Sequence, residues 1–153
     1  MRRLQMSNVQ SILDQKGSSV FSITPDDVLA HALLQLNEQK VGALLVLNES
    51  GDIKGILSER DIVRHFSRRL EHINTTEIKV KEVMTAGVTC VKLHQSLEDC
   101  LQLMTAGRFR HLPVVDDEGK VVGLVSIGDV VKAVLDAKDF QIGELEHYIT
   151  NTY

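Results

Sequence analysis

Residues 108–131 read RFRHLPVVDDEGKVVGLVSIGDVV, and this stretch decides the predicted fold. An apolar, mostly β-branched run at 112–115 is followed by an acidic turn at 116–119 that ends in glycine. The apolar pattern resumes at 121–125, and a short polar segment then leads into two valines. The stretch therefore predicts a strand, a turn, a returning strand and the start of a helix.

Ser126 ends the second predicted strand, and Asp129 follows at the start of the predicted helix. A hydroxyl and a carboxylate at this spacing can share one helix N-terminus, where backbone N–H groups point outward and favour anions. Two interpretations are open. The pair caps the helix, or it forms a small cradle in which donors bind a phosphate and the carboxylate accepts from paired hydroxyls.

The same pattern occurs 68 residues earlier. A shift by 68 without gaps aligns residues 20–64 with 88–132, and ten of the 45 aligned positions are identical. The identities include both Ser-x-x-Asp pairs, at 58–61 and 126–129, and both turn glycines. We infer a duplicated β-α-β-β-α unit, and hence an α+β fold of α/β-type repeats. Each unit alone would expose an apolar sheet face, so two units are expected to pack through their sheets with pseudo-two-fold symmetry and two equivalent clefts.

The chain is expected to divide into a first repeat, a linker, a second repeat and a C-terminal helix or tail, at 9–71, 72–79, 80–136 and 137–153. In the last part Ile142, Leu145 and Ile149 fall on one helical face. This segment exceeds what two repeats need. It would cover the core of its own chain or bind a second subunit.

Composition narrows the class of protein. A net charge of −4 argues against general nucleic-acid binding, and no apolar run approaches the ~20 residues of a membrane span. Cys90 and Cys100 make neither a disulfide framework nor a zinc site, which favours a reducing, cytoplasmic setting. The six histidines show no H-x-H or H-E-x-x-H spacing, so we expect no metal site.

The doubled unit resembles a tandem pair of cystathionine-β-synthase (CBS) domains, the Bateman module. The resemblance covers about residues 9–136 and rests on Gly-x-x-Ser-x-x-Asp ahead of each second helix. The local phrases ERD at 59–61, MT at 84–85, RHLPVVD at 110–116 and SIGD at 126–129 look like stand-alone two-domain members. Those are small regulatory proteins of bacteria and plant organelles without a fused catalytic domain. Members commonly pair as disk-like dimers, so a homodimer is expected.

This resemblance implies binding of an adenosyl compound in clefts between the repeats, such as AMP, ADP, ATP, NAD(H) or S-adenosylmethionine, with no catalytic cofactor. Each cleft would take its ribose-binding Asp from one repeat and its adenine wall from the other. A carboxylate suits this role because it can accept two hydrogen bonds from a vicinal diol.

For one cleft the resemblance assigns Asp129 to the ribose hydroxyls and Ser126 with Gly128 to the phosphate. The adenine wall, which would act through backbone hydrogen bonds and apolar contact, is Thr24, Val41, Gly42 and Ala43. His111 matches a position where related sensors often carry an Arg on the phosphate. A neutral imidazole donates one hydrogen bond only, so phosphate affinity is expected to be weaker or pH-dependent. The open alternative is that His111 only packs in the structure.

For the other cleft the resemblance assigns Ser58, Arg60 and Asp61, with Lys92, Phe109 and Arg110 on the facing wall. More basic residues are expected around Asp61 than around Asp129, so this cleft suits two phosphates and its counterpart one. We therefore expect a dinucleotide in the first and AMP in the second. Two alternatives stay open: Lys92 points to solvent, and the outer arginines Arg64 and Arg68 lie on a solvated helix face.

The predicted function is a regulator that senses adenine-nucleotide state and passes a conformational change to a partner protein that the sequence does not name. A second hypothesis is a structural dimerisation module with vestigial clefts. A third, an enzyme acting on a nucleotide, is disfavoured because each predicted cleft offers one carboxylate and one hydroxyl, with no second acid or Ser–His pair.

Overall fold

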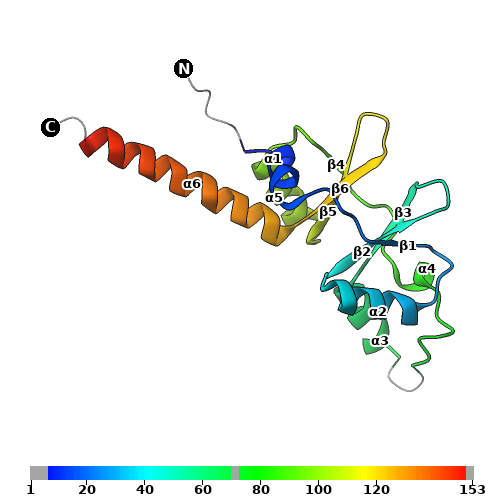
Figure 1. Cartoon of the computed structure of the whole chain (residues 1–153). Helices are drawn as coiled ribbons and strands as arrows, with labels where there is room; N and C mark the ends of the chain where they lie inside the picture. The colour runs from blue at the N-terminus through cyan, green and yellow to red at the C-terminus, as the bar shows by residue number, and fades with distance from the viewer. Residues whose placement is uncertain (1–6, 70–72, 151–153) are drawn as a thin grey trace.

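The structure is a computed structural model, and it describes residues 7–69 and 73–150. Two three-stranded sheets form its centre (Figure 1), with strand orders β1-β2-β3 and β4-β5-β6. The strands are β1 (Ser22–Ile23), β2 (Ala43–Leu47), β3 (Ile53–Ser58), β4 (Val91–Lys92), β5 (His111–Val115) and β6 (Val121–Ser126). In each sheet the first strand runs parallel to the second, and the second runs antiparallel to the third.

The helices complete two copies of the predicted β-α-β-β-α unit. They are α1 (Val9–Lys16), α2 (Leu29–Gln39), α3 (Glu59–Ser67), α4 (Val80–Val83), α5 (Leu97–Gly107) and α6 (Ile127–Thr150). The duplication extends to the strand register: Ala43 lies opposite Ser58, and His111 lies opposite Ser126. The register shifts at the equivalent place in both sheets, after Val46 and after Val114. The predicted α+β fold of two repeats is confirmed.

Helix α1 completes the core of the second repeat rather than the first. Val9, Ile12 and Leu13 are buried in one cluster with residues of the second sheet and α5. The backbone N–H of Val9 donates to Gln95 O at 3.0 Å, and that of Gln10 donates to Leu93 O at 2.9 Å. The first helix of the described residues therefore packs on the second repeat, although the first repeat follows it in the sequence.

Helix α4 makes the reverse exchange. Val80 and Val83 are buried in the cluster of the first repeat. The Val80 N–H donates to Asp27 O at 2.9 Å, and the Lys81 N–H donates to Pro25 O at 2.9 Å. Because each core includes a helix that precedes the other repeat, the two repeats form one interlocked unit.

The second face of each sheet is also buried. Leu44 and Val46 belong to the first core, whereas Leu45 points to the opposite face and is still 0% exposed. Pro113, the equivalent residue of the second repeat, is buried as well. The imidazole of His111 lies near Gly42, where an added Cβ would come within 3.7 Å of it. These observations fit the expected packing of the repeats through their sheets.

Helix α6 continues without a break across position 136 and projects away from the repeats (Figure 1). Its outer half carries large exposed apolar side chains, among them Phe140 (64%), Ile142 (54%), Leu145 (62%) and Ile149 (60%). The tail therefore does not cover the core of its own chain. The expected boundary at 71/72 and tail residues 151–153 lie outside the described residues. Across 7–69 and 73–150, no helix is long and apolar enough to cross a membrane.

Candidate functional site

Asp61 is a buried carboxylate held by the start of α3. Its side chain is 8% exposed, and its Oδ2 accepts from the N–H and hydroxyl of Ser58, at 2.8 and 2.7 Å. The Asp61 N–H donates back to Ser58 Oγ at 3.3 Å, so the cap interpretation holds for this pair. The Thr85 hydroxyl donates to Oδ1 at 2.8 Å. The cap therefore fixes the position of the carboxylate instead of excluding it from a site.

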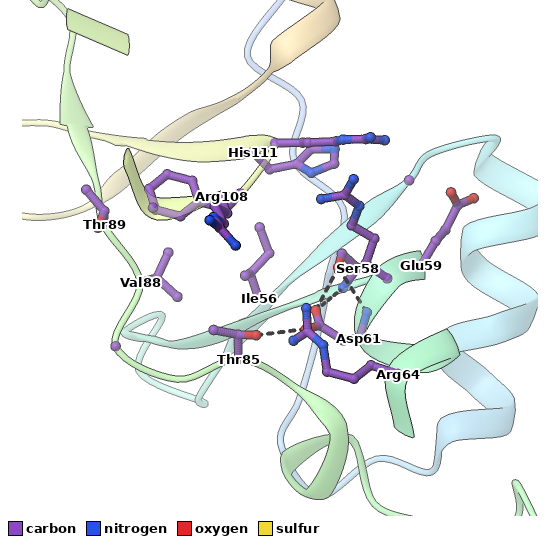
Figure 2. Close-up of a pocket in the computed structure, with 16 residues that line it drawn as sticks. Ile56, Ser58, Glu59, Asp61, Arg64, Thr85, Val88, Thr89, Arg108 and His111 are labelled. Carbon is purple, nitrogen blue, oxygen red and sulfur yellow. Dashed lines mark hydrogen bonds and ion pairs between the residues drawn. The ribbon is translucent and has the colours of Figure 1, made fainter. Parts of the chain in front are cut away.

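A cleft opens beside this carboxylate, and Figure 2 shows Asp61 and its dashed contacts at one side of it. Its volume is about 240 Å³, close to the ~300 Å³ at which small-molecule sites begin. The lining residues come from β3, α3 and the residue before β2 in the first repeat, from the segment after α4, and from the end of α5 to the start of β5 in the second repeat. They are Gly42, Ile56, Ser58, Glu59, Arg60, Asp61, Arg64, Thr85, Gly87, Val88, Thr89, Gly107, Arg108, Phe109, Arg110 and His111. The cleft therefore lies between the repeats, as predicted.

Positive charge dominates the lining. Arg60 and Arg64 come from α3, and Arg108 and Arg110 come from the segment before β5. Arg64 lies 3.7 Å from Asp61 Oδ1 and is 62% exposed, so it belongs to the cleft rather than only to a solvated face. Guanidinium groups bind phosphate oxygens in two-pronged fashion. Such a lining favours an anionic ligand.

The structure brings together most residues that the sequence assigns to this cleft, since Ser58, Arg60, Phe109 and Arg110 line it with Asp61. Lys92 is not among the lining residues. Its Nζ donates to Asp116 O and to Asp117 Oδ1, both at 3.2 Å. The Lys92 side chain is therefore bound by the acidic turn of the second repeat and does not reach the cleft.

Sequence reasoning missed the segment that follows α4. Thr85, Val88 and Thr89 line the cleft (Figure 2), and Thr85 exchanges two backbone hydrogen bonds of 2.9 Å with Ile56. The Met-Thr phrase at 84–85 was the available signal. Its role depends on the path of α4 across the first repeat, which no local pattern reveals.

His111 and Gly42 were assigned to the Asp129 cleft, yet both line the cleft of Asp61. His111 is the first residue of β5 and pairs with Ser126, the residue that caps the helix of Asp129. Burial lowers the pKa of His111 below its ordinary value; Asp129 and Glu59 raise it, and Lys16 and Arg110 lower it. The imidazole is therefore held neutral near pH 7 and can donate one hydrogen bond.

Asp129 repeats the cap of Asp61. Its Oδ2 accepts from the Ser126 N–H at 2.8 Å, and its own N–H donates to Ser126 Oγ at 3.2 Å. Lys16, the last residue of α1, donates to the same Oδ2 at 2.7 Å. Partial burial raises the pKa of Asp129, but the hydrogen bonds from Lys16 and Ser126 outweigh burial and leave it below the ordinary value.

The other residues assigned to the Asp129 cleft are more dispersed. Thr24 donates its hydroxyl to Asp27 at 3.4 Å, Val41 packs against the first core, and Ala43 is buried. Gly128 lies in the first turn of α6 beside Asp129. The described part of the chain holds no group of three or more His, Cys, Asp or Glu side chains that could bind a metal ion.

Comparison with known proteins gives a family. The model of the CBS domain matches residues 16–68 and 80–136. A solved protein from Burkholderia ambifaria MC40-6, named as a signal-transduction protein with CBS domains, is 41% identical over 85% of this chain and 95% of its own, with a TM-score of 0.79. The chloroplastic protein CBSX2 of Arabidopsis thaliana, solved in complex with AMP, is 31% identical over 86% of this chain and 98% of its own, with a TM-score of 0.69.

A third relative, the mitochondrial CBS domain-containing protein CBSX3 of Arabidopsis thaliana, is 31% identical over 97% of this chain and 75% of its own. The two matched segments coincide with the two structural repeats, and these relatives align with both of them together. The chain therefore belongs to the CBS domain family and carries two CBS domains in tandem.

Proposed function

We propose that this CBS pair is a regulatory module that binds an adenine nucleotide and transmits its occupancy to a partner protein. The observation that carries the proposal is the cleft between the repeats, where Asp61 is held in place beside four arginines. The relative CBSX2, which was solved in complex with AMP, supports the choice of ligand class.

In this proposal the ribose hydroxyls of the nucleotide donate to Asp61, and its phosphates contact arginines from both repeats. Arg60 belongs to α3, whereas Arg108 and Arg110 precede β5. Several guanidinium groups suit the triphosphate of ATP or the diphosphate of NAD(H), as well as the single phosphate of AMP. For the cleft predicted around Asp129 we propose a shorter ligand, AMP.

The proposed mechanism is a shift between relative positions of the two repeats. A nucleotide that contacts α3 on one side and residues 107–111 on the other binds best to one arrangement of them. Its occupancy therefore favours that arrangement by the difference in affinity. A partner protein that binds one arrangement better than the other would therefore respond to the nucleotide concentration.

We propose regulation rather than catalysis, because the Asp61 carboxylate and the Ser58 hydroxyl are bonded to each other as a helix cap. Among the described residues, neither is paired with a histidine that would activate it. We also propose that the protein is located in a reducing compartment such as the cytoplasm. Cys90 and Cys100 are free thiols, and burial, with a smaller contribution from Asp99, raises the pKa of Cys100 to about 11.

Isothermal titration with AMP and NAD tests the ligand. A hydrogen bond to a charged group contributes about 1.5–3 kcal/mol, so Asp61→Asn is expected to weaken binding at the cleft of Asp61 by roughly ten- to hundredfold. Asp129→Asn is the matched control, and the NAD signal should survive in it. Equal loss of the NAD signal in both variants would contradict the assignment of the dinucleotide. Absence of binding by any adenosyl compound would favour a structural dimerisation module.

We also propose that the outer half of α6 pairs with a second copy of the chain. Leu135, Ile142 and Ile149 recur every seven residues. Val131 and Leu145 occupy two of the three alternate positions of this heptad pattern, and Lys138 occupies the third. The five apolar residues all have large side chains that are exposed in this chain. A self-complementary helix face of this kind fits a two-fold symmetric pair.

Sedimentation velocity tests this pairing. Ile142→Lys places a charge at the centre of the heptad face and is expected to convert a dimer to a monomer at micromolar concentrations, because an unpaired buried charge is costly. Phe140→Lys is the control, since Phe140 is also exposed but lies off that face. A monomeric wild-type chain, or equal dissociation in both variants, would refute this interface.

A further inference from the structure

The two Ser-x-x-Asp caps differ in the group that the preceding helix brings to the carboxylate. In the first, Thr85 donates its N–H to Ile56 O at 2.9 Å and its hydroxyl to Asp61 at 2.8 Å. In the second, Lys16 makes the equivalent pair of contacts with one ammonium group. Its Nζ donates to Leu124 O at 2.9 Å and to Asp129 at 2.7 Å. Leu124 and Ile56 are equivalent residues of the two repeats.

This substitution changes the charge at the second carboxylate. Asp61 accepts its short hydrogen bonds from the neutral groups of Ser58 and Thr85. Among the described residues, its only ion pair is with the exposed Arg64, 3.7 Å from Oδ1. Asp129 instead accepts a direct 2.7 Å hydrogen bond from the ammonium group of Lys16, in an ion pair whose side chains are 37% exposed for the lysine and 26% for the aspartate. The lysine is therefore within reach of any ligand that binds Asp129.

A vicinal diol binds a carboxylate best when both oxygens can accept its hydrogens. Oδ2 of Asp129 already accepts from the Ser126 N–H and from Lys16. A ribose that uses both oxygens of Asp129 competes with a charged ammonium group. At Asp61 it competes with the hydroxyls of Ser58 and Thr85, which are neutral and can turn to other acceptors. The two carboxylates should therefore differ in their affinity for the same sugar.

We propose that Lys16 is the specificity-determining residue of a ligand site at Asp129, where it competes with ribose hydroxyls for the carboxylate. The inference rests on the proposed function, since it assumes that Asp129 is a ribose acceptor. Lys16 is the last residue of α1, and α1 completes the second core. A ribonucleoside that takes Asp129 therefore also releases the end of α1 from the first turn of α6.

Titration with adenosine provides the test, because this ribonucleoside carries no charge and any salt effect must arise in the protein. Isothermal titration of the full chain is expected to give a tighter site and a weaker site, and Asp129→Asn should remove the weaker one. Lys16→Met is expected to tighten the weaker site by up to about fivefold, the range of an exposed ion pair. Lys81→Met is the matched control, because Lys81 ties α4 to Asp26 at 2.6 Å outside the clefts.

A salt series on the unmodified chain gives a second measurement that needs no variant. Salt screens the ion pair between Lys16 and Asp129, so adenosine affinity at the weaker site should rise between about 0.05 and 0.5 M salt. The rise should vanish in Lys16→Met and persist in Lys81→Met. Adenosine binding that neither salt nor Lys16→Met changes would overturn the competition and leave the proposed function standing. Failure of adenosine and AMP to bind any of these proteins would overturn the proposed function itself, and the competition with it.

Discussion

Gly55→Ala is expected to lower the free energy of unfolding by about 2–3 kcal/mol, as overpacking against fixed backbone does. A Cβ at position 55 would lie 2.6 Å from the carbonyl oxygen of Thr85 and 2.8 Å from Met84 Sδ. That oxygen cannot retreat freely, because it accepts from the Ile56 N–H at 2.9 Å. Thr85 also bonds Asp61, so the shift that accommodates alanine would move a wall of the candidate site.

Gly123→Ala is the matched control in the second repeat. Its Cβ would lie 2.7 Å from Leu13 Cδ1, at the end of a flexible side chain rather than against backbone. Leu13 can change rotamer, so we expect a loss of about 1 kcal/mol or less. Urea unfolding of the two variants measures the difference. A larger loss in Gly123→Ala than in Gly55→Ala would show that backbone contact with Thr85 does not govern the first repeat.

The duplicated unit could be predicted because its signals are local. Alternating apolar residues, turn glycines and the Ser58–Asp61 spacing each constrain only a few neighbouring residues, and the copy 68 residues later repeats them. The same local signals could not separate a helix cap from a ligand site. In the structure the Ser58–Asp61 pair forms the cap and also lines the cleft, so the two interpretations do not exclude each other.

The composition of the clefts could be predicted only in part, because it depends on how distant segments pack. An amphipathic helix such as α1 or α4 shows which face is buried, but not which sheet it covers. Thr85 and Lys16 reach their carboxylates through this exchange of helices. Lys92 illustrates a different limit: a long, flexible side chain finds its partner, here Asp117, among several within reach.

Because the helices are exchanged, we predict that a change at Val80 affects the repeat that precedes it in the sequence. Val80 is 0% exposed in the core of the first repeat. Val80→Ala is expected to cost about 2 kcal/mol of stability, because it removes two buried methyl groups and leaves a cavity. The loss should appear first in the first repeat, although Val80 follows that repeat in the sequence. Amide exchange in β2 and β3 should therefore accelerate more than in β5 and β6.

Val9→Ala is the converse experiment, since Val9 is equally buried but belongs to the core of the second repeat. The loss of stability should be similar to that of Val80→Ala, and amide exchange should now accelerate more in β5 and β6. Hydrogen exchange measured by mass spectrometry on both variants separates the two patterns. If each substitution instead loosened the repeat nearest to it in sequence, or both repeats equally in both variants, the exchanged helices would not be the elements that stabilise each core. A crossed pattern would mean that a movement of α1 changes the second repeat and a movement of α4 changes the first. A nucleotide-controlled shift between the repeats requires this kind of coupling.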